Sequence, residues 1–247
     1  TPFIWNVRQI SNEFLAEQML ADVHAVVFDL DGTLLDRRRS FERFVRDQRE
    51  RFAYALQVIE PEQYDRTLVE LDRDGYGPRR ELFTGMIAQF ELPATLAGTL
   101  LNDYRAGFPS ACLLFPDASR TLSSLRAFGL KLGLITNGSV RMQSRKLECL
   151  ALSPMFDTIL ISDAEGISKP DRRIFHRALE QLNVNAAQAV FVGDHPEVDV
   201  AGARAAGMRA VWRRDPIVSG VVEADGVVQE LGDLFALLGL QQGGRSS

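Results

Sequence analysis

The stretch Ala25-Val-Val-Phe-Asp-Leu-Asp-Gly-Thr-Leu-Leu-Asp36 decides the fold of this chain and carries its most informative pair of side chains. Four apolar residues lead directly into Asp29, and a second carboxylate follows at Asp31. An apolar run of this length, ended by the turn-forming Gly32, is typical of a strand buried on both faces of a parallel sheet. Two aspartates at the end of such a strand repel each other unless a cation or a proton intervenes. The stretch therefore favours metal-assisted chemistry in which one carboxylate attacks and the other handles a proton.

The alternative is that Asp29 and Asp31 only cap a turn before the next helix. Asp-Gly is a common turn-forming pair, so Asp31 and Gly32 by themselves would fit this alternative. Asp29 argues against it, because the end of a buried strand is a costly place for an unpaired charge. The choice depends on whether other strand ends supply partners.

Three further segments consist of an apolar run followed by polar residues, namely 131–138, 157–162 and 188–194. The polar groups at or after their ends are Thr136, Asn137, Lys169, Asp194 and Asp199. Helical patterns separate the segments, and this alternation predicts an α/β fold with a doubly wound parallel sheet. The carboxyl ends of parallel strands meet at one edge of the sheet, where such folds bind their ligands. We therefore expect these groups to lie near the two aspartates.

Taken together, these motifs resemble those of the haloacid dehalogenase-like hydrolase superfamily. The four matching stretches are Asp29-Leu-Asp-Gly-Thr33, Thr136-Asn-Gly138, Lys169-Pro170 and Gly193-Asp-His-Pro-Glu-Val-Asp199. They occur in family order and frame the chain from about Val23 to Trp212. The resemblance implies a Rossmann-like core and places the chain in the phosphatase branch of the superfamily.

The resemblance also implies a division of roles. Asp29 would attack phosphorus and form an aspartyl-phosphate, and Asp31 would protonate the leaving alcohol and then activate water. The implied cofactor is Mg²⁺, held by the carboxylates of Asp29 and Asp194 and by the main-chain carbonyl of Asp31.

The remaining motif residues would bind phosphate or support the site. Thr136 would hydrogen-bond a phosphoryl oxygen beside the main-chain amide of Asn137, although both residues also suit a plain strand-to-helix turn. Lys169, one of only three lysines in the chain, would neutralise the nucleophile and the phosphate. Asp199 would orient Lys169 or support the metal, or it is an ordinary acid near a helix N-terminus. Lys146 lies on a helical pattern that we interpret as a solvated face.

Between Asp36 and Cys112 the apolar period becomes helical, and this segment resembles the helical cap of the family's first structural class. We therefore predict a core domain of residues 1–36 and 113–247 and an all-helical cap domain of residues 37–112. A cap above the sheet edge would exclude water and select the substrate.

Two groups of arginines in the predicted cap are candidates for contact with the substrate. Arg37, Arg38 and Arg39 open the cap, and we interpret them as a solvated hinge. Arg79 and Arg80 belong to a stretch broken by glycine and proline, which predicts a loop between cap helices. Their contact with an anionic substrate and a solvated turn are equally compatible with the sequence.

Composition limits the partners. The net charge of −5 gives no basic footprint for nucleic acid, and no run approaches the roughly 20 apolar residues of a membrane helix. The N-terminus lacks the order of a signal peptide, and the two cysteines lack metal-ligand spacing. We expect a cytoplasmic enzyme with a small phosphorylated substrate, no nucleic-acid partner and no membrane partner. Segment 11–20 is predicted to form an amphipathic helix.

Four other functions compete for the same motifs. Asp31 argues against dehalogenation, because a halide leaving group needs no proton. The predicted cap contains no lysine, which excludes relatives that cleave carbon–phosphorus bonds with a cap lysine. A phosphomutase keeps both aspartates and stays an alternative. A non-catalytic binding protein would be expected to lack at least one chemical group, and all are present in the sequence.

Overall fold

The computed structural model describes residues 20, 22–75, 78–214 and 222–240. These residues form one six-stranded parallel sheet in the order β3-β2-β1-β4-β5-β6. The strands are β1 (Ala25–Phe28), β2 (Lys131–Thr136), β3 (Thr158–Ile161), β4 (Ala189–Gly193), β5 (Arg209–Arg213) and β6 (Gly226–Val228). The predicted doubly wound sheet is confirmed, and β5 and β6 are strands that the sequence did not predict. The helix predicted over 11–20 lies outside the described residues, apart from Leu20.

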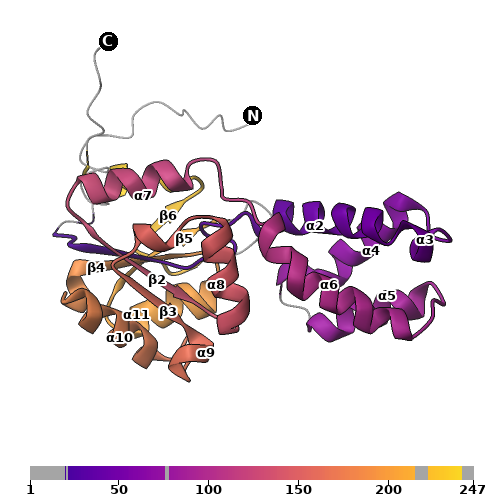
Figure 1. Ribbon diagram of the computed structural model, residues 1–247. Coiled ribbons are helices and arrows are strands. Elements are labelled where there is room, and N and C mark those ends of the chain that lie inside the picture. The colour runs from indigo at the N-terminus through magenta and orange to yellow at the C-terminus, as the bar shows by residue number, and fades with distance from the viewer. Residues whose placement is uncertain (1–19, 21, 76–77, 215–221, 241–247) are drawn as a thin grey trace, which may run out of the picture.

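Helices cover both faces of the sheet, with α7 on one side and α10 and α11 on the other (Figure 1). The helices of this core are α7 (Ala118–Ala127), α8 (Val140–Cys149), α9 (Ser162–Glu165), α10 (Arg172–Leu182), α11 (Gly202–Ala205) and α12 (Leu234–Leu237). Alternate residues of β1 point to opposite faces. Val26 and Phe28 join the apolar cluster beneath α7, α8 and α12, whereas Ala25 and Val27 join the cluster beneath α10 and α11. This two-sided burial explains the uninterrupted apolar run in the sequence.

The topology brings the motif residues to one edge. β1 lies between β2 and β4, with Phe28 in register with Leu134 and Val192. The strand order reverses direction at β1, and the crevice at such a switch point is the usual ligand site of an open α/β sheet. Asp29 follows β1 directly, and Asp194 follows β4 directly.

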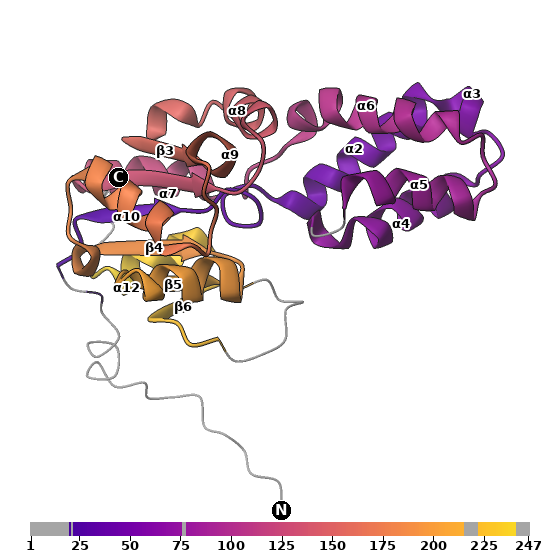
Figure 2. The same ribbon diagram turned by 90° about the horizontal axis from the view of Figure 1, so that it is seen from below.

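A helical insertion, residues 37–111, lies beside the core and joins it at both of its ends (Figures 1 and 2). Its helices are α2 (Arg37–Arg51), α3 (Ala53–Leu56), α4 (Pro61–Asp72), α5 (Arg79–Gln89) and α6 (Thr95–Ala111). The ring of Tyr104 lies 5.4 Å from that of Phe44 and 5.0 Å from that of Phe108, between centroids, so α2 and α6 share an aromatic core. The division into two domains stays a prediction.

The secondary structure of the insertion differs from the sequence expectation at Arg79 and Arg80. Arg79 and Arg80 are the first two residues of α5 and not part of a loop. Pro78 precedes them, and a proline at the start of a helix leaves no main-chain hydrogen bond unmade. Among the described residues, no helix is long and apolar enough to cross a bilayer.

Candidate active site

A buried chain of ion pairs surrounds Lys169 at the edge of the sheet. Its ammonium donates to Asp29 Oδ1 at 2.5 Å and to Asp199 Oδ1 at 2.7 Å. Burial raises the pKa of Asp29 to about 7. The attraction of Lys169 lowers this pKa, and the repulsion of Asp199 raises it further. Burial lowers the pKa of Lys169, but the attraction of Asp199 and Asp29 outweighs it, so the pKa lies above its ordinary value. Lys169 therefore stays a cation beside the predicted nucleophile.

Asn137 fixes the main chain that carries Lys169. The Asn137 side chain donates from Nδ2 to the Lys169 carbonyl at 2.9 Å and accepts at Oδ1 from the Lys169 N–H at 3.0 Å. This pair of hydrogen bonds ties the end of β2 to the loop between α9 and α10. The sequence predicted only the main-chain amide of Asn137 as a phosphate donor, so the structural role of its side chain is an additional finding.

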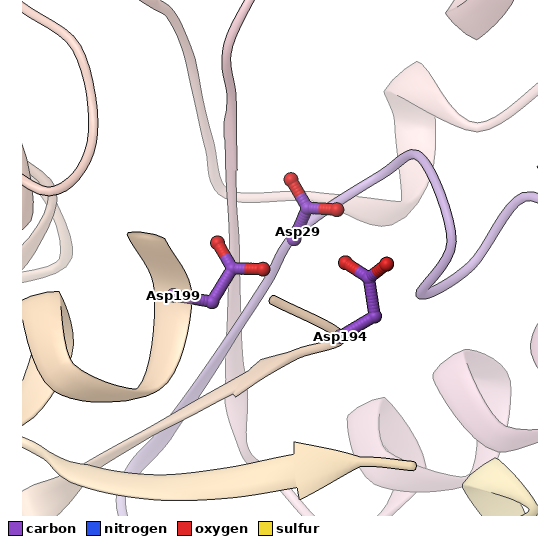
Figure 3. Close-up of side chains that lie close together, drawn as sticks. All are labelled: Asp29, Asp194 and Asp199. Carbon is purple, nitrogen blue, oxygen red and sulfur yellow. The ribbon is translucent and has the colours of Figure 1, made fainter. Parts of the chain in front are cut away.

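Three carboxylates, those of Asp29, Asp194 and Asp199, converge at the ends of β1 and β4 (Figure 3). They offer oxygens that all lie within 4.8 Å of one another. Burial raises the pKa of Asp194 well above its ordinary value, and repulsion from Asp29 and Asp199 adds to the shift. Gly32 leaves room for Asp194, because a Cβ at this position would collide with that carboxylate, and its φ of +88° suits glycine.

This donor set fits a hard divalent cation, which prefers carboxylate and carbonyl oxygens and would relieve the repulsion. Asp199 is the least available of the three. Its Oδ1 accepts from Lys169, and its Oδ2 accepts from the His195 N–H at 3.0 Å. The contact of Asp199 with Lys169 is compatible with the predicted role of Asp199 in orienting that lysine, and metal binding by Asp29 and Asp194 stays a prediction.

Asp31 lies in a different pocket from Asp29. Lys146 Nζ donates to both carboxylate oxygens of Asp31 at 2.7 Å, and Gln143 Nε2 donates to Asp31 Oδ2 at 2.9 Å. Burial raises the pKa of Asp31, but Lys146 and Gln143 more than offset it, so the pKa lies below its ordinary value. Lys146 is buried, and its interpretation as a residue of a solvated helix face was wrong. The reason is that α8 turns Gln143, Lys146 and Leu147 inward.

Thr136 ends β2 and is also linked to this second pocket. Its hydroxyl accepts from Gln143 Nε2 at 2.5 Å and is buried. Gln143 therefore bridges the predicted phosphate ligand Thr136 and the predicted acid–base residue Asp31. Neither Gln143 nor Lys146 belongs to the four sequence motifs, and both were missed.

A cavity of about 1100 Å³ contains both pockets and extends to the helical insertion. Arg37 lines it but is buried, with Nη2 2.8 Å from Asp72 Oδ1, so its interpretation as part of a solvated hinge was wrong. From the insertion, Arg38, Arg39 and Arg105 also line the cavity.

Of the two predicted arginine contacts of the insertion, only Arg80 has a described side chain. Arg80 is exposed on α5 and is not among the residues that line it. The side chain of Arg79 lies outside the described part of the structure. Substrate contact by Arg79 and Arg80 stays a prediction.

Comparison with known proteins identifies the family. The profile of haloacid dehalogenase-like (HAD) hydrolases matches residues 23–207, so the chain belongs to that family. A glyceraldehyde 3-phosphate phosphatase of Pyrococcus abyssi is 30% identical over 193 residues, 77% of this chain and 81% of that protein. A phosphatase of Mycobacterium tuberculosis is 33% identical over 228 residues, 87% of this chain and 97% of that protein.

A solved HAD phosphatase of Thermococcus onnurineus is 30% identical to the chain, with a TM-score of 0.62 over 88% of this chain and 98% of that one. Family, relatives and fold agree. The chain is a hydrolase of the HAD family and, within it, a phosphatase that acts on phosphoric monoesters.

Proposed function

We propose that the chain is a magnesium-dependent phosphatase that hydrolyses a small phosphorylated metabolite through an aspartyl-phosphate on Asp29. The observation that carries the proposal is the contact of the Lys169 ammonium with Asp29, next to Asp194. A carboxylate beside a fixed cation and at the floor of an open cavity is suited to attack a phosphate dianion. The similarity to phosphatases supports the same reaction.

The first half of the reaction uses Asp29 and Asp31 in different roles. Thr136 Oγ1 and the main-chain amide of Asn137 hold the phosphoryl oxygens, and Lys169 reduces the repulsion between phosphate and nucleophile. An oxygen of Asp29 bonds to phosphorus while the bond from phosphorus to the leaving oxygen breaks. Asp31 gives its proton to that oxygen, so the product leaves as a neutral alcohol.

The second half returns the enzyme to its starting state. Asp31, now ionised, takes a proton from water, whose oxygen attacks phosphorus and releases Asp29 and inorganic phosphate. The pKa of Asp31 lies below its ordinary value in the free enzyme, so its carboxylate is ionised, which is the form that can accept a proton. A phosphate dianion bound beside Asp31 raises the pKa of its carboxyl, which favours the protonated form needed in the first half.

Magnesium would be held by the carboxylates of Asp29 and Asp194 and by the main-chain carbonyl of Asp31. When bound, it supplies positive charge that neutralises the phosphate and the nucleophile. The raised pKa values of Asp29 and Asp194 support this proposal, because both groups need a cation to be ionised together. We also propose a cytoplasmic location. The two cysteines are free thiols, which is typical of proteins in a reducing compartment.

The test is a screen of the purified protein with magnesium against phosphorylated sugars, nucleotides, small organic phosphates and a generic aryl phosphate. Release of inorganic phosphate that requires magnesium, together with its loss in Asp29→Asn, is the expected result. Turnover that needs a bisphosphate activator, with an isomeric phosphate as product, would identify a phosphomutase instead. No turnover of any phosphate ester would contradict the proposal.

A further inference from the structure

Lys146 and Gln143 form a second polar cluster that the four motifs do not include. Both lie on α8 and are buried in the described structure, although neither residue type favours burial. A buried lysine loses its hydration and needs a compensating partner. For Lys146 that partner is Asp31, whose two carboxylate oxygens both lie 2.7 Å from Nζ.

We propose that Lys146, assisted by Gln143, is a positioning residue that fixes the carboxylate of Asp31 for proton transfer at the leaving-group oxygen. This inference rests on the proposed role of Asp31 as the acid and base. It adds two residues to the proposed active site and assigns them an effect on proton transfer by Asp31 but not on the attack by Asp29.

The geometry explains why Asp31 needs such support. Its side chain is 27% exposed, whereas the side chain of Asp29 is 9% exposed. The carboxylate of Asp31 therefore lies at the open side of the cavity, where it would rotate without a partner. Lys146 prevents this rotation, because an ammonium that contacts both oxygens fixes the plane of the carboxylate.

Lys146 also contacts an aromatic ring of the helical insertion. Its Nζ lies 5.4 Å from the centroid of the Phe108 ring on α6, which is within the range of a cation–π contact. Phe108 belongs to the helical insertion, so the insertion helps to define the position of the ammonium. Asp31 is thus aligned by residues from both the core and the insertion.

Gln143 connects this alignment to the phosphate. Its Nε2 donates to Asp31 Oδ2 at 2.9 Å and to Thr136 Oγ1 at 2.5 Å. The proton-transfer group and a proposed phosphate ligand therefore keep a fixed mutual position. Errors of about 1 Å in such positions reduce rates by about a hundredfold.

The test compares Lys146→Met and Lys146→Arg with wild type, with Asp31→Asn as the reference and Lys131→Met as the control. Lys131 donates to the Leu182 carbonyl at 2.6 Å, away from the cavity lining, and so matches the lysine substitution without touching the site. The values of kcat and KM are measured with magnesium on an alkyl phosphate and on an activated aryl phosphate. Thermal melts identify variants that do not fold.

We expect Lys146→Met to lose about a hundredfold in kcat/KM on the alkyl phosphate and less than about tenfold on the aryl phosphate, because kcat/KM reports the first step and the aryl leaving group needs no proton. Lys146→Arg should recover part of the alkyl-phosphate activity because a cation is retained. Lys131→Met should behave as wild type.

Equal losses of kcat/KM on both substrates in Lys146→Met would overturn the inference, as would a raised KM with unchanged kcat, which identifies a substrate-binding lysine. The Asp31→Asn variant distinguishes a failure of the proposed role of Lys146 from a failure of the proposed role of Asp31. If Asp31→Asn discriminates between the leaving groups and Lys146→Met does not, only this inference fails. If Asp31→Asn does not discriminate either, the proposed role of Asp31 fails with it.

Discussion

Asp29 and Asp31 are two residues apart in the chain but occupy pockets with opposite electrostatics. Asp29 shares Lys169 with Asp199 and lies near Asp194, and its pKa is raised to about 7. Asp31 has Lys146 on both of its oxygens, and its pKa lies below the ordinary value. Each of the two aspartates thus contacts a different lysine. Lys169 also contacts Asp199, whereas the carboxylate that Lys146 contacts is that of Asp31. Two residues of the same type therefore have pKa values shifted in opposite directions, because the number and sign of the charges around them differ.

The largest expected effect concerns the nucleophile in the Asp29 pocket. Asp29→Asn retains the shape of the side chain but removes the oxygen that attacks phosphorus. We expect kcat to fall by about 10⁴-fold or more on both alkyl and aryl phosphates. A steady-state assay with circular dichroism as a folding control would check this. Activity within tenfold of wild type would remove Asp29 from the mechanism.

The second prediction concerns Asp31 and is selective. Asp31→Asn should reduce hydrolysis of alkyl phosphates by about 10²- to 10⁴-fold, the usual contribution of a general acid or base. The activated aryl phosphate should lose much less in its first step, because its leaving group departs without a proton. The measurement is the ratio of the two kcat/KM values, because kcat/KM reports the first step, whereas kcat also includes the hydrolysis of the intermediate that both substrates share. Equal losses would show that Asp31 serves only the metal or the fold.

The third prediction concerns magnesium binding by the carboxylates of Asp29 and Asp194. Asp194→Asn should raise the magnesium concentration for half-maximal rate by at least about tenfold, since even outer-shell partners of metal ligands have effects of this size. Excess magnesium should partly restore the rate, and calcium should inhibit because its coordination is longer and looser. A metal titration after treatment with chelator provides the measurement. Full activity after exhaustive chelation would be incompatible with this site.

The same pocket predicts a pH-dependent stability. The folded-state pKa values of Asp29 and Asp194 are raised above the value of 3.8 that applies to the unfolded chain. Their contribution to stability is therefore fully present below pH 3.8 and is lost as the pH rises through the folded-state values, about 7 for Asp29.

In chelator, Asp194→Asn should therefore melt above wild type at pH 8, by about 2–4 °C for each kcal/mol of relieved repulsion. The difference should shrink at pH 5 and reverse at pH 8 when magnesium is added. Thermal melts at the two pH values test this. A wild type that melts above Asp194→Asn at pH 8 in chelator would contradict the assigned repulsion.

The smallest expected effect lies in the helical insertion. Arg105 is exposed and lines the cavity, whereas Arg80 is exposed and does not line it. We expect Arg105→Ala to raise KM for the preferred substrate by about tenfold or less and to leave kcat nearly unchanged. Arg80→Ala is the matched control. A changed substrate profile for Arg80→Ala, and none for Arg105→Ala, would instead support the prediction made from sequence.

The sequence predicted the residues that follow strands and missed those that lie on helices. Asp29, Lys169 and Asp194 were predictable because parallel strands end at one edge and short motifs mark those ends. Gln143 and Lys146 lie three residues apart on α8, in the inward stripe that also contains Leu147. Polar residues within an apolar stripe were the available signal, but the partner of Lys146 lies 115 residues away in the sequence.

The other differences have similar physical causes. Arg37 forms its ion pair with Asp72, a contact across 35 residues that no local pattern reveals. β6 has only three residues, too few for a periodic signal. β5 begins and ends with an arginine, which leaves only three apolar residues between them. The fold class depends on long apolar runs and was therefore predictable. The pairing of each aspartate with its own lysine depends on tertiary contacts and was not.

The central claim is that Asp29 forms the bond to phosphorus and Asp31 moves the proton. The most direct measurement is a rapid-quench experiment on Asp31→Asn with an activated aryl phosphate and magnesium, followed by mass spectrometry of the peptide that contains Asp29. The account predicts a burst of about one equivalent of aryl alcohol per enzyme and phosphate on Asp29, because formation of the intermediate needs no acid and its hydrolysis lacks the base. Turnover without a burst and without phosphate on Asp29 would contradict it.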